Sequence, residues 1–184
     1  MKDEIDLWEN PSDDEINLWK NMVEKSNRKT IVIQEGQQKI IDSVNYFGRP
    51  VLGKIVVLPM SSLPKFTCDS SWACISITDT DVENPIPINE KNRIDILRIK
   101  FDDIEFERQT LKPITEAQGA EIWTFVDNIW DKVELLMVHC VAGISRSTAV
   151  SKAISDIYQP EYSDYYDQLY SPNKLVYEIM RSQK

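Results

Sequence analysis

The sequence predicts an α/β fold in which helices flank a central, mainly parallel sheet. Short apolar runs alternate along the chain with segments whose apolar residues recur every three or four positions. One apolar run, residues 133–138, passes through a short loop into a segment where Val150, Ala153 and Ile154 share one helical face. In sheets of this kind ligands bind outside the carboxyl ends of the strands, so we expect the functional site at that loop.

The individual elements follow from local residue patterns. Strands are predicted where β-branched and apolar residues cluster between turn residues, at positions 30–33, 53–58, 72–78, 94–101 and 134–139. A brief helix is predicted over 38–47, and Thr115 with Gln118 forms a capping box for a longer helix. A tyrosine-rich helix and a final helix after Asn173 follow the loop helix, whereas 61–67 and 79–92 are predicted loops.

Composition limits the class of protein. The 184 residues carry a formal net charge of −9, and 42% are hydrophobic, which suffices for the core of one domain. The negative charge argues against a nucleic-acid partner and against attraction to an anionic membrane. No apolar run approaches a membrane span, and the first residues lack the character of a signal peptide. With only three cysteines and no disulfide framework, we expect a cytoplasmic protein.

Residues 1–30 are predicted to be an acidic N-terminal extension, and residues 31–184 the domain that contains the expected functional loop. The extension holds a short repeat, because the pattern Glu-Ile-x-Leu-Trp that starts at Glu4 recurs at Glu15. Exposed tryptophans are uncommon, so we expect Trp8 and Trp19 to dock on a surface. That surface is either the domain itself or a partner protein.

The loop after residues 133–138 carries the chemistry. The single histidine, His139, precedes Cys140, and Arg146 follows six residues after the cysteine. Backbone N–H groups at the start of a helix form an anion site, and Gly143 allows the sharp turn that brings them together. The Arg146 guanidinium can bind two phosphate oxygens at once, and the same positive surroundings favour the thiolate of Cys140. Ser147 is a candidate hydrogen-bond partner of the sulfur.

The run His-Cys-x5-Arg-Ser at 139–147 resembles the signature of the cysteine-dependent protein tyrosine and dual-specificity phosphatases, and is closest to the compact dual-specificity-like members. The resemblance implies that the thiolate forms a phosphocysteine, which water then hydrolyses. It also implies that His139 orients the loop by hydrogen bonds from its ring, and it requires no cofactor. The residues implied to bind the phosphate are Val141, Ala142, Gly143, Ile144, Ser145 and Arg146.

The resemblance further implies an aspartic acid that protonates the leaving oxygen, on a loop after an earlier strand. Aligning the end of the predicted strand at 94–101 with the family pattern puts Asp103 at this position. Asp102 is the reserve candidate, and Glu105 is a more distant one. Lys100 stands where many relatives have proline, which leaves the entry angle of the loop open.

Phosphoproteins are the expected substrates, because the loop adds no lysine to Arg146 and the chain is acidic. Two alternatives remain open at this point. One is a phosphate-binding module without turnover, and the other is a phosphatase acting on RNA 5′-phosphates or inositol phosphates. Cys68 and Cys74 are expected to be buried structural residues, or resolving thiols for Cys140 under oxidation. No cluster of side chains has the spacing of a metal site.

Overall fold

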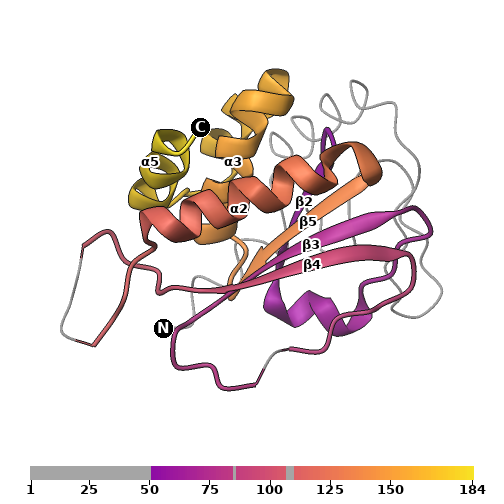
Figure 1. Ribbon diagram of the computed structural model, residues 1–184, viewed down its shortest axis with the longest axis horizontal. Coiled ribbons are helices and arrows are strands. Elements are labelled where there is room, and N and C mark those ends of the chain that lie inside the picture. The colour runs from indigo at the N-terminus through magenta and orange to yellow at the C-terminus, as the bar shows by residue number, and fades with distance from the viewer. Residues whose placement is uncertain (1–50, 85, 107–109) are drawn as a thin grey trace.

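Five strands form the central sheet of the protein, with the order β1-β2-β5-β3-β4. The computed structural model describes residues 51–84, 86–106 and 110–184. Helices cover one face of the sheet, and a short 3-10 helix lies against the other (Figure 1). The strands are β1 (Val51–Leu52), β2 (Ile55–Pro59), β3 (Trp72–Thr78), β4 (Arg93–Lys100) and β5 (Leu135–Cys140). The α/β fold with a flanked central sheet is confirmed.

The sheet is parallel except for its first strand. β1 pairs antiparallel with β2, whereas β2, β3, β4 and β5 run in one direction. β5 occupies the middle position between β2 and β3, and all six of its residues are buried. A strand covered on both faces is expected to be a continuous apolar run, which explains the pattern of residues 133–138.

Four α-helices and three 3-10 helices are described beside the sheet. Their bounds are η2 (Met60–Lys65), α2 (Glu116–Ile129), η3 (Trp130–Lys132), α3 (Arg146–Tyr158), η4 (Pro160–Tyr162), α4 (Ser163–Leu169) and α5 (Lys174–Ser182). The capping box of α2 is present as predicted. The Thr115 hydroxyl accepts a hydrogen bond from Gln118 N at 3.3 Å, and the Gln118 side chain accepts one from Thr115 N at 3.0 Å.

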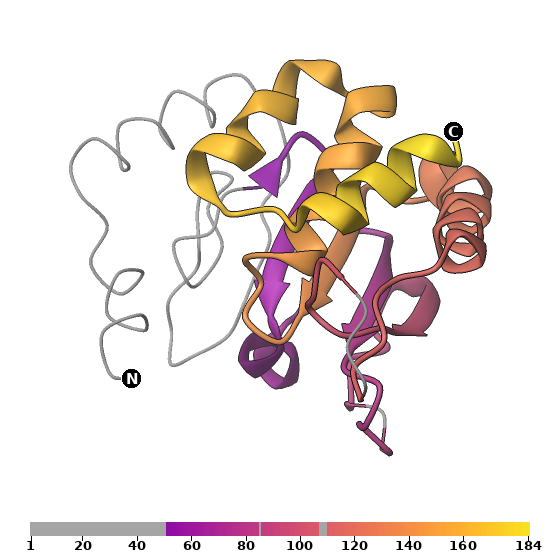
Figure 2. The same cartoon turned by 90° about the vertical axis from the view of Figure 1, so that its left-hand side faces the viewer.

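Apolar side chains pack on both faces of the sheet. The larger core lies between the sheet and helices α2, α3 and α5, as Figure 2 shows from the side. A second core lies on the opposite face, where η2 covers Val56, Trp72 and Met137. A third cluster joins β1 and β2 to the tyrosine-rich helix through Tyr162, Tyr166 and Tyr170. The carboxyl ends of the parallel strands are therefore held rigidly by packing on each side.

The prediction of a loop over residues 61–67 was wrong, because Met60–Lys65 is the 3-10 helix η2. Leu63 and Phe66 are fully buried and hold this segment against the second face of the sheet. The predicted strand at 53–58 also begins later, at Ile55. Gly53 lies in a turn with a φ of +56°, a conformation that side chains other than glycine adopt only with strain.

Several sequence predictions fall outside the described residues. They are the acidic extension at 1–30 with its tryptophan repeat, the strand at 30–33, the helix at 38–47 and the domain boundary at residue 30. Among the residues that the structure does describe, none of the helices combines the length and the apolar character needed to cross a bilayer.

Candidate active site

The site is built around the loop that joins β5 to α3. Gly143 has a φ of +67°, and a Cβ atom at this position would lie 2.7 Å from the backbone nitrogen of Pro59. Only glycine therefore fits the turn. Met60 N donates a hydrogen bond to Val141 O at 3.1 Å, which fastens the loop to the end of the neighbouring strand. The catalytic loop thus rests on two adjacent strands.

Cys140, the last residue of β5, lies beneath this loop with an exposed fraction of 1%. Its Sγ atom is 3.1 Å from Ser147 Oγ, in the first turn of α3. The backbone N–H of Gly143 donates to the same sulfur at 3.3 Å. Two polar groups, one from the loop and one from α3, therefore meet at this sulfur.

Arg146 lies beside the cysteine, and its side chain is only 3% exposed. Its Nη1 atom donates to Phe101 O at 2.7 Å and pairs with Asp79 Oδ1 at 2.6 Å. These contacts fix the plane of the guanidinium. Nε, on the opposite edge, is buried and makes no hydrogen bond to any described residue. Its recorded contact is a long ion pair with Asp103 Oδ2, at 3.8 Å, so this edge of the guanidinium keeps a donor that no described residue accepts from at hydrogen-bond distance.

Three side chains contact the carboxylate of Asp103 beside Arg146. Its Oδ1 atom accepts hydrogen bonds from Ser145 Oγ at 2.7 Å and from Asn173 Nδ2 at 2.8 Å. Its Oδ2 atom lies 3.8 Å from Arg146 Nε. The structure therefore brings the first acid candidate to the edge of the catalytic loop, with its side chain 38% exposed.

Asp102, the reserve candidate, has different surroundings. It is buried, and its carboxylate accepts hydrogen bonds from Thr80 N at 3.0 Å, Thr80 Oγ1 at 2.8 Å and Lys112 N at 2.7 Å. Burial opposes its ionisation, but these hydrogen bonds and the charge of Arg146 outweigh burial and hold the pKa below its usual range. A carboxylate that joins two loops through three hydrogen bonds, and whose pKa is lowered, fits a structural role better than that of a proton donor.

His139 does not make the hydrogen bonds that were expected of it. Its ring is fully buried, and within the described part of the chain neither ring nitrogen has a hydrogen-bond partner. Burial lowers the pKa of His139 from 6.5 to about 4 against the opposing effect of the Cys140 backbone, which lies too far outside ideal geometry to count as a hydrogen bond, and the charges of Arg98 and Arg146 add to the lowering. The ring is neutral and lies in the sheet beside Leu58 and Ser76, on the strands next to β5.

This burial predicts a pH-dependent stability. The unfolded chain binds the histidine proton near pH 6.5 and the folded protein only near pH 4, so the free energy of unfolding falls as the pH drops through that window. Between pH 7 and pH 5 we expect His139 to account for a loss of about 2 kcal/mol. Urea unfolding at both pH values measures it. His139→Gln removes this contribution, so equal pH dependence in the variant and the wild type contradicts the prediction.

The other two cysteines lie on the far side of the sheet. Cys68 and Cys74 belong to the core beneath η2, whereas Cys140 belongs to the core beneath the helices. Burial raises the pKa of the Cys74 thiol to about 12, and it also raises that of Cys68. Both thiols are free, and their position favours the structural role over that of a resolving thiol. In residues 51–184, apart from the undescribed gaps, no three His, Cys, Asp or Glu side chains form a group suited to a metal ion.

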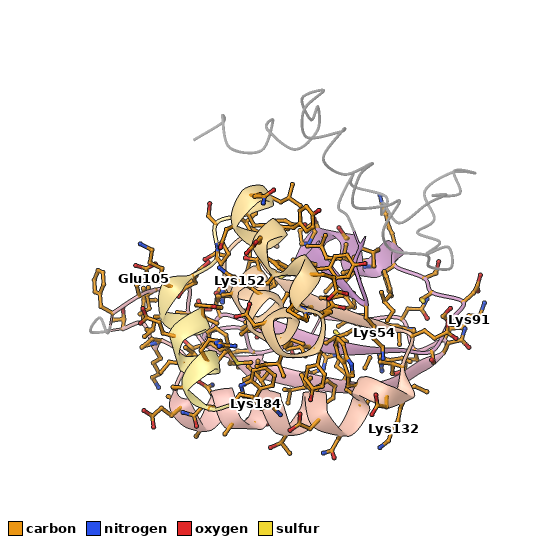
Figure 3. All side chains as sticks on the ribbon, turned by 90° about the horizontal axis from the view of Figure 1, so that it is seen from above. Lys54, Lys91, Glu105, Lys132, Lys152 and Lys184 are labelled. Carbon is orange, nitrogen blue, oxygen red and sulfur yellow. The ribbon has the colours of Figure 1, made fainter. Side chains whose placement is uncertain are left out.

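A cavity of about 520 Å³ adjoins the loop between β5 and α3 at Ser145 and reaches Asn173 at the start of α5. Glu105 and Lys152 belong to its lining and lie on the same side of the molecule in Figure 3. Asp167 and Lys174 also line the cavity, and Asp167 forms an ion pair with Lys152. Two acidic and two basic side chains balance each other, so the cavity provides no excess of positive charge beside the loop.

Solved structures resemble this chain, although no family model and no curated protein matches it. The human tyrosine phosphatase-like serine/threonine/tyrosine-interacting protein aligns with a TM-score of 0.52 and 20% identity, over 73% of this chain and 93% of its own. A variant of human DUSP28 gives a TM-score of 0.51 and 13% identity, over 71% and 88%. Tk-PTP in its active form gives 0.51 and 15%, over 71% and 91%. The chain has the fold of the cysteine-dependent tyrosine phosphatases.

Within this phosphatase fold, sequence reasoning missed two residues of the site. Asp79 follows the end of β3 and binds Arg146, and Asn173 precedes α5 and binds Asp103. A signal for Asp79 was present, because polar residues just beyond parallel strands gather at one edge of the sheet. Asn173 carried the signal of a helix N-cap, but nothing in its pattern pointed to the catalytic loop.

Proposed function

We propose that this protein is a phosphomonoester hydrolase that removes phosphate from phosphoproteins through a phosphocysteine intermediate. Phosphotyrosine is the principal substrate class, with phosphoserine or phosphothreonine as a further one. One observation carries the proposal. Cys140 Sγ contacts Ser147 Oγ and Gly143 N, and the same short segment carries the buried Arg146, whose Nε lies 3.8 Å from the acid candidate Asp103. This arrangement provides a nucleophile and an anion-binding group in one loop.

The geometry suits a two-step displacement. In the first step the thiolate of Cys140 attacks phosphorus, the bond from phosphorus to the leaving oxygen breaks, and Asp103 gives that oxygen a proton. In the second step Asp103 takes a proton from water, water oxygen bonds to phosphorus, and the sulfur leaves. The Ser147 hydroxyl, 3.1 Å away, stabilises the departing thiolate. Arg146 and the loop N–H groups stabilise the charge on the transferred phosphoryl oxygens.

Charge supports protein side chains with a single phosphate as substrates. The loop residues between Cys140 and Arg146 carry no charge, and the charged residues of the adjoining cavity cancel. A polyphosphorylated inositol ring or an RNA end would gain little from such surroundings, since several phosphates need several cations. The name of Tk-PTP and the name of the tyrosine phosphatase-like human protein agree with this substrate class.

A phosphate-binding module without turnover is the second candidate. The human protein of similar fold is named as phosphatase-like and as an interacting protein. Its name describes binding, which supports this candidate. Against this candidate, Cys140, Arg146 and Asp103 are all present and lie within one site. We therefore favour catalysis.

Hydrolysis of matched phosphotyrosine and phosphothreonine peptides tests the proposal. Phosphate release is measured in reducing buffer with EDTA, with a Cys140→Ser variant beside the wild type. Release from phosphotyrosine alone indicates a deep pocket, and release from both peptides indicates dual specificity. Absence of cysteine-dependent release from either peptide refutes the proposal, and RNA 5′-phosphates and inositol phosphates are then the substrates to assay.

The proposed thiolate also bears on where the protein works. A catalytic cysteine must stay reduced, which is the condition of the cytoplasm, so we propose a cytoplasmic location. The acidic extension remains a candidate docking element for a partner protein, and its tryptophan repeat is the part to alter in a test of that role.

A further inference from the structure

Asn173 joins three segments that meet at the catalytic loop. Its side chain is buried, and its Nδ2 atom donates to Asp103 Oδ1 at 2.8 Å. Its backbone N–H donates to Ser145 O at 3.2 Å, which ties it to the residue before Arg146. Its Oδ1 atom accepts from Val176 N at 3.0 Å and so caps α5. One residue therefore contacts the acid and the start of α5 through its side-chain amide, and the loop before Arg146 through its backbone.

The acid depends on such contacts for its orientation. Asp103 is more than one-third exposed, so packing alone does not fix its carboxylate. Both short hydrogen bonds, from Asn173 and from Ser145, reach the same oxygen, Oδ1. The other oxygen, Oδ2, is the one that lies nearer to Arg146 Nε, at 3.8 Å. An acid anchored through one oxygen presents the other toward the bound phosphate.

We propose that Asn173 is the positioning residue of the proton donor: its amide holds Asp103 Oδ1 so that Oδ2 carries the proton to the leaving oxygen. This inference rests on the proposed function, because it assigns a role in that same reaction. Glu105 makes a second contact between the acid loop and α5. Its carboxylate accepts a hydrogen bond at 3.4 Å from the backbone nitrogen of Lys174, the residue after Asn173. The acid loop is thus fastened to the start of α5 at two successive residues.

A purely structural role for Asn173 as a helix cap is the competing explanation, and one substitution separates the two. Asn173→Ser keeps an oxygen that can accept from Val176 N, because serine is a good N-cap residue. It removes the amide that reaches Asp103. Should this variant fold poorly, Asn173→Thr serves the same comparison, since threonine also caps helices, lacks the amide and adds no charge beside Asp103.

The test compares leaving groups. Hydrolysis of phenyl phosphate depends more on protonation of the leaving oxygen than hydrolysis of p-nitrophenyl phosphate does. A poorly positioned acid should therefore lower kcat mainly with phenyl phosphate. For Asn173→Ser we expect kcat to fall on the order of 10- to 100-fold with phenyl phosphate, and less than about 3-fold with p-nitrophenyl phosphate. In an Asp103→Asn background the same substitution should have almost no further effect, because a positioning residue acts through the group it positions.

Asn89→Ser is the matched control. Asn89 also bridges two segments, since its Nδ2 atom donates to Phe66 O at 3.2 Å and its Oδ1 atom accepts from Lys91 N at 2.8 Å. It lies before β4, away from the carboxyl end of that strand, and should leave both rates unchanged. Equal losses with the two substrates, or additive losses in the double variant, overturn the inference alone. Absence of cysteine-dependent turnover in the wild type overturns the proposed function, and this inference with it.

Discussion

Replacing Cys140 with serine should lower turnover of p-nitrophenyl phosphate by at least about 10⁴-fold, because the chain then lacks its nucleophile. A serine hydroxyl is hardly ionised at neutral pH, and an alkoxide is a far poorer leaving group than a thiolate. The two hydrogen-bond partners of the sulfur, Ser147 Oγ and Gly143 N, would remain beside the new oxygen. The loss therefore reflects chemistry and not collapse of the loop.

Anion binding should survive the same substitution. Arg146 and the loop N–H groups are unchanged in Cys140→Ser, so inorganic phosphate should still raise the melting temperature of the variant. Arg146→Lys, which removes the planar guanidinium, should abolish that stabilisation. A Cys140→Ser protein that neither binds phosphate nor unfolds cooperatively would show that the cysteine is needed for the fold, and the nucleophile assignment would lose its support.

Cys68→Ser is the matched control for the nucleophile. Cys68 is 2% exposed and Cys140 is 1% exposed, so both substitutions place a hydroxyl in a buried position. Cys68 lies in the core on the opposite face of the sheet, and burial raises its pKa, so its thiol is poorly reactive. Turnover by the folded fraction should stay at the wild-type level. A comparable loss in both variants would mean that buried polarity, and not the lost nucleophile, stops the reaction.

Local patterns in the sequence were enough to predict most of the fold. The run from Trp72 to Thr78 matches β3 residue for residue, because a short, mostly apolar run that is buried throughout ends at a polar segment on each side. The capping box at Thr115 marks the start of α2 as predicted. The 3-10 helix η2 escaped prediction because it contains Pro64 and is too short for apolar periodicity. Only its burial against the sheet, a tertiary effect, orders it.

The site was predictable where its residues are neighbours in the chain, and hidden where the fold brings them together. Cys140, Gly143, Arg146 and Ser147 share one loop, so their spacing alone pointed to a common function. Asp79 and Asn173 enter from other elements, and no local pattern joins them to that loop. The hydrogen-bond role expected for His139 failed for a similar reason. Which partners a buried ring finds depends on the exact distances to the strands beside it, and the Ser76 hydroxyl on β3 is buried without a hydrogen bond to any described residue, just as the His139 ring is.

Asp103→Asn should lower kcat by about 10²- to 10⁴-fold with phosphotyrosine peptide or phenyl phosphate, because the amide cannot give a proton to the leaving oxygen. The effect should shrink with p-nitrophenyl phosphate, whose leaving group departs without protonation. Asparagine is nearly isosteric with aspartate and can still accept from Ser145 Oγ and Asn173 Nδ2. Inorganic phosphate should therefore bind at least as well as it does to the wild type, since a negative charge beside Arg146 is removed.

The neighbouring substitution, Asp102→Asn, should give the opposite result and so decides between the two candidates. The two oxygens of Asp102 accept three hydrogen bonds, and an amide nitrogen in place of Oδ2 would face two donors, Thr80 Oγ1 and Lys112 N. We expect a loss of stability of about 1–3 kcal/mol, with kcat per folded molecule nearly unchanged. If Asp102→Asn instead reproduces the leaving-group dependence and Asp103→Asn does not, the proton donor is Asp102. In that case the hydrogen bonds from Thr80 and Lys112 to Asp102 must break during each turnover, because they occupy the oxygens that would carry the proton.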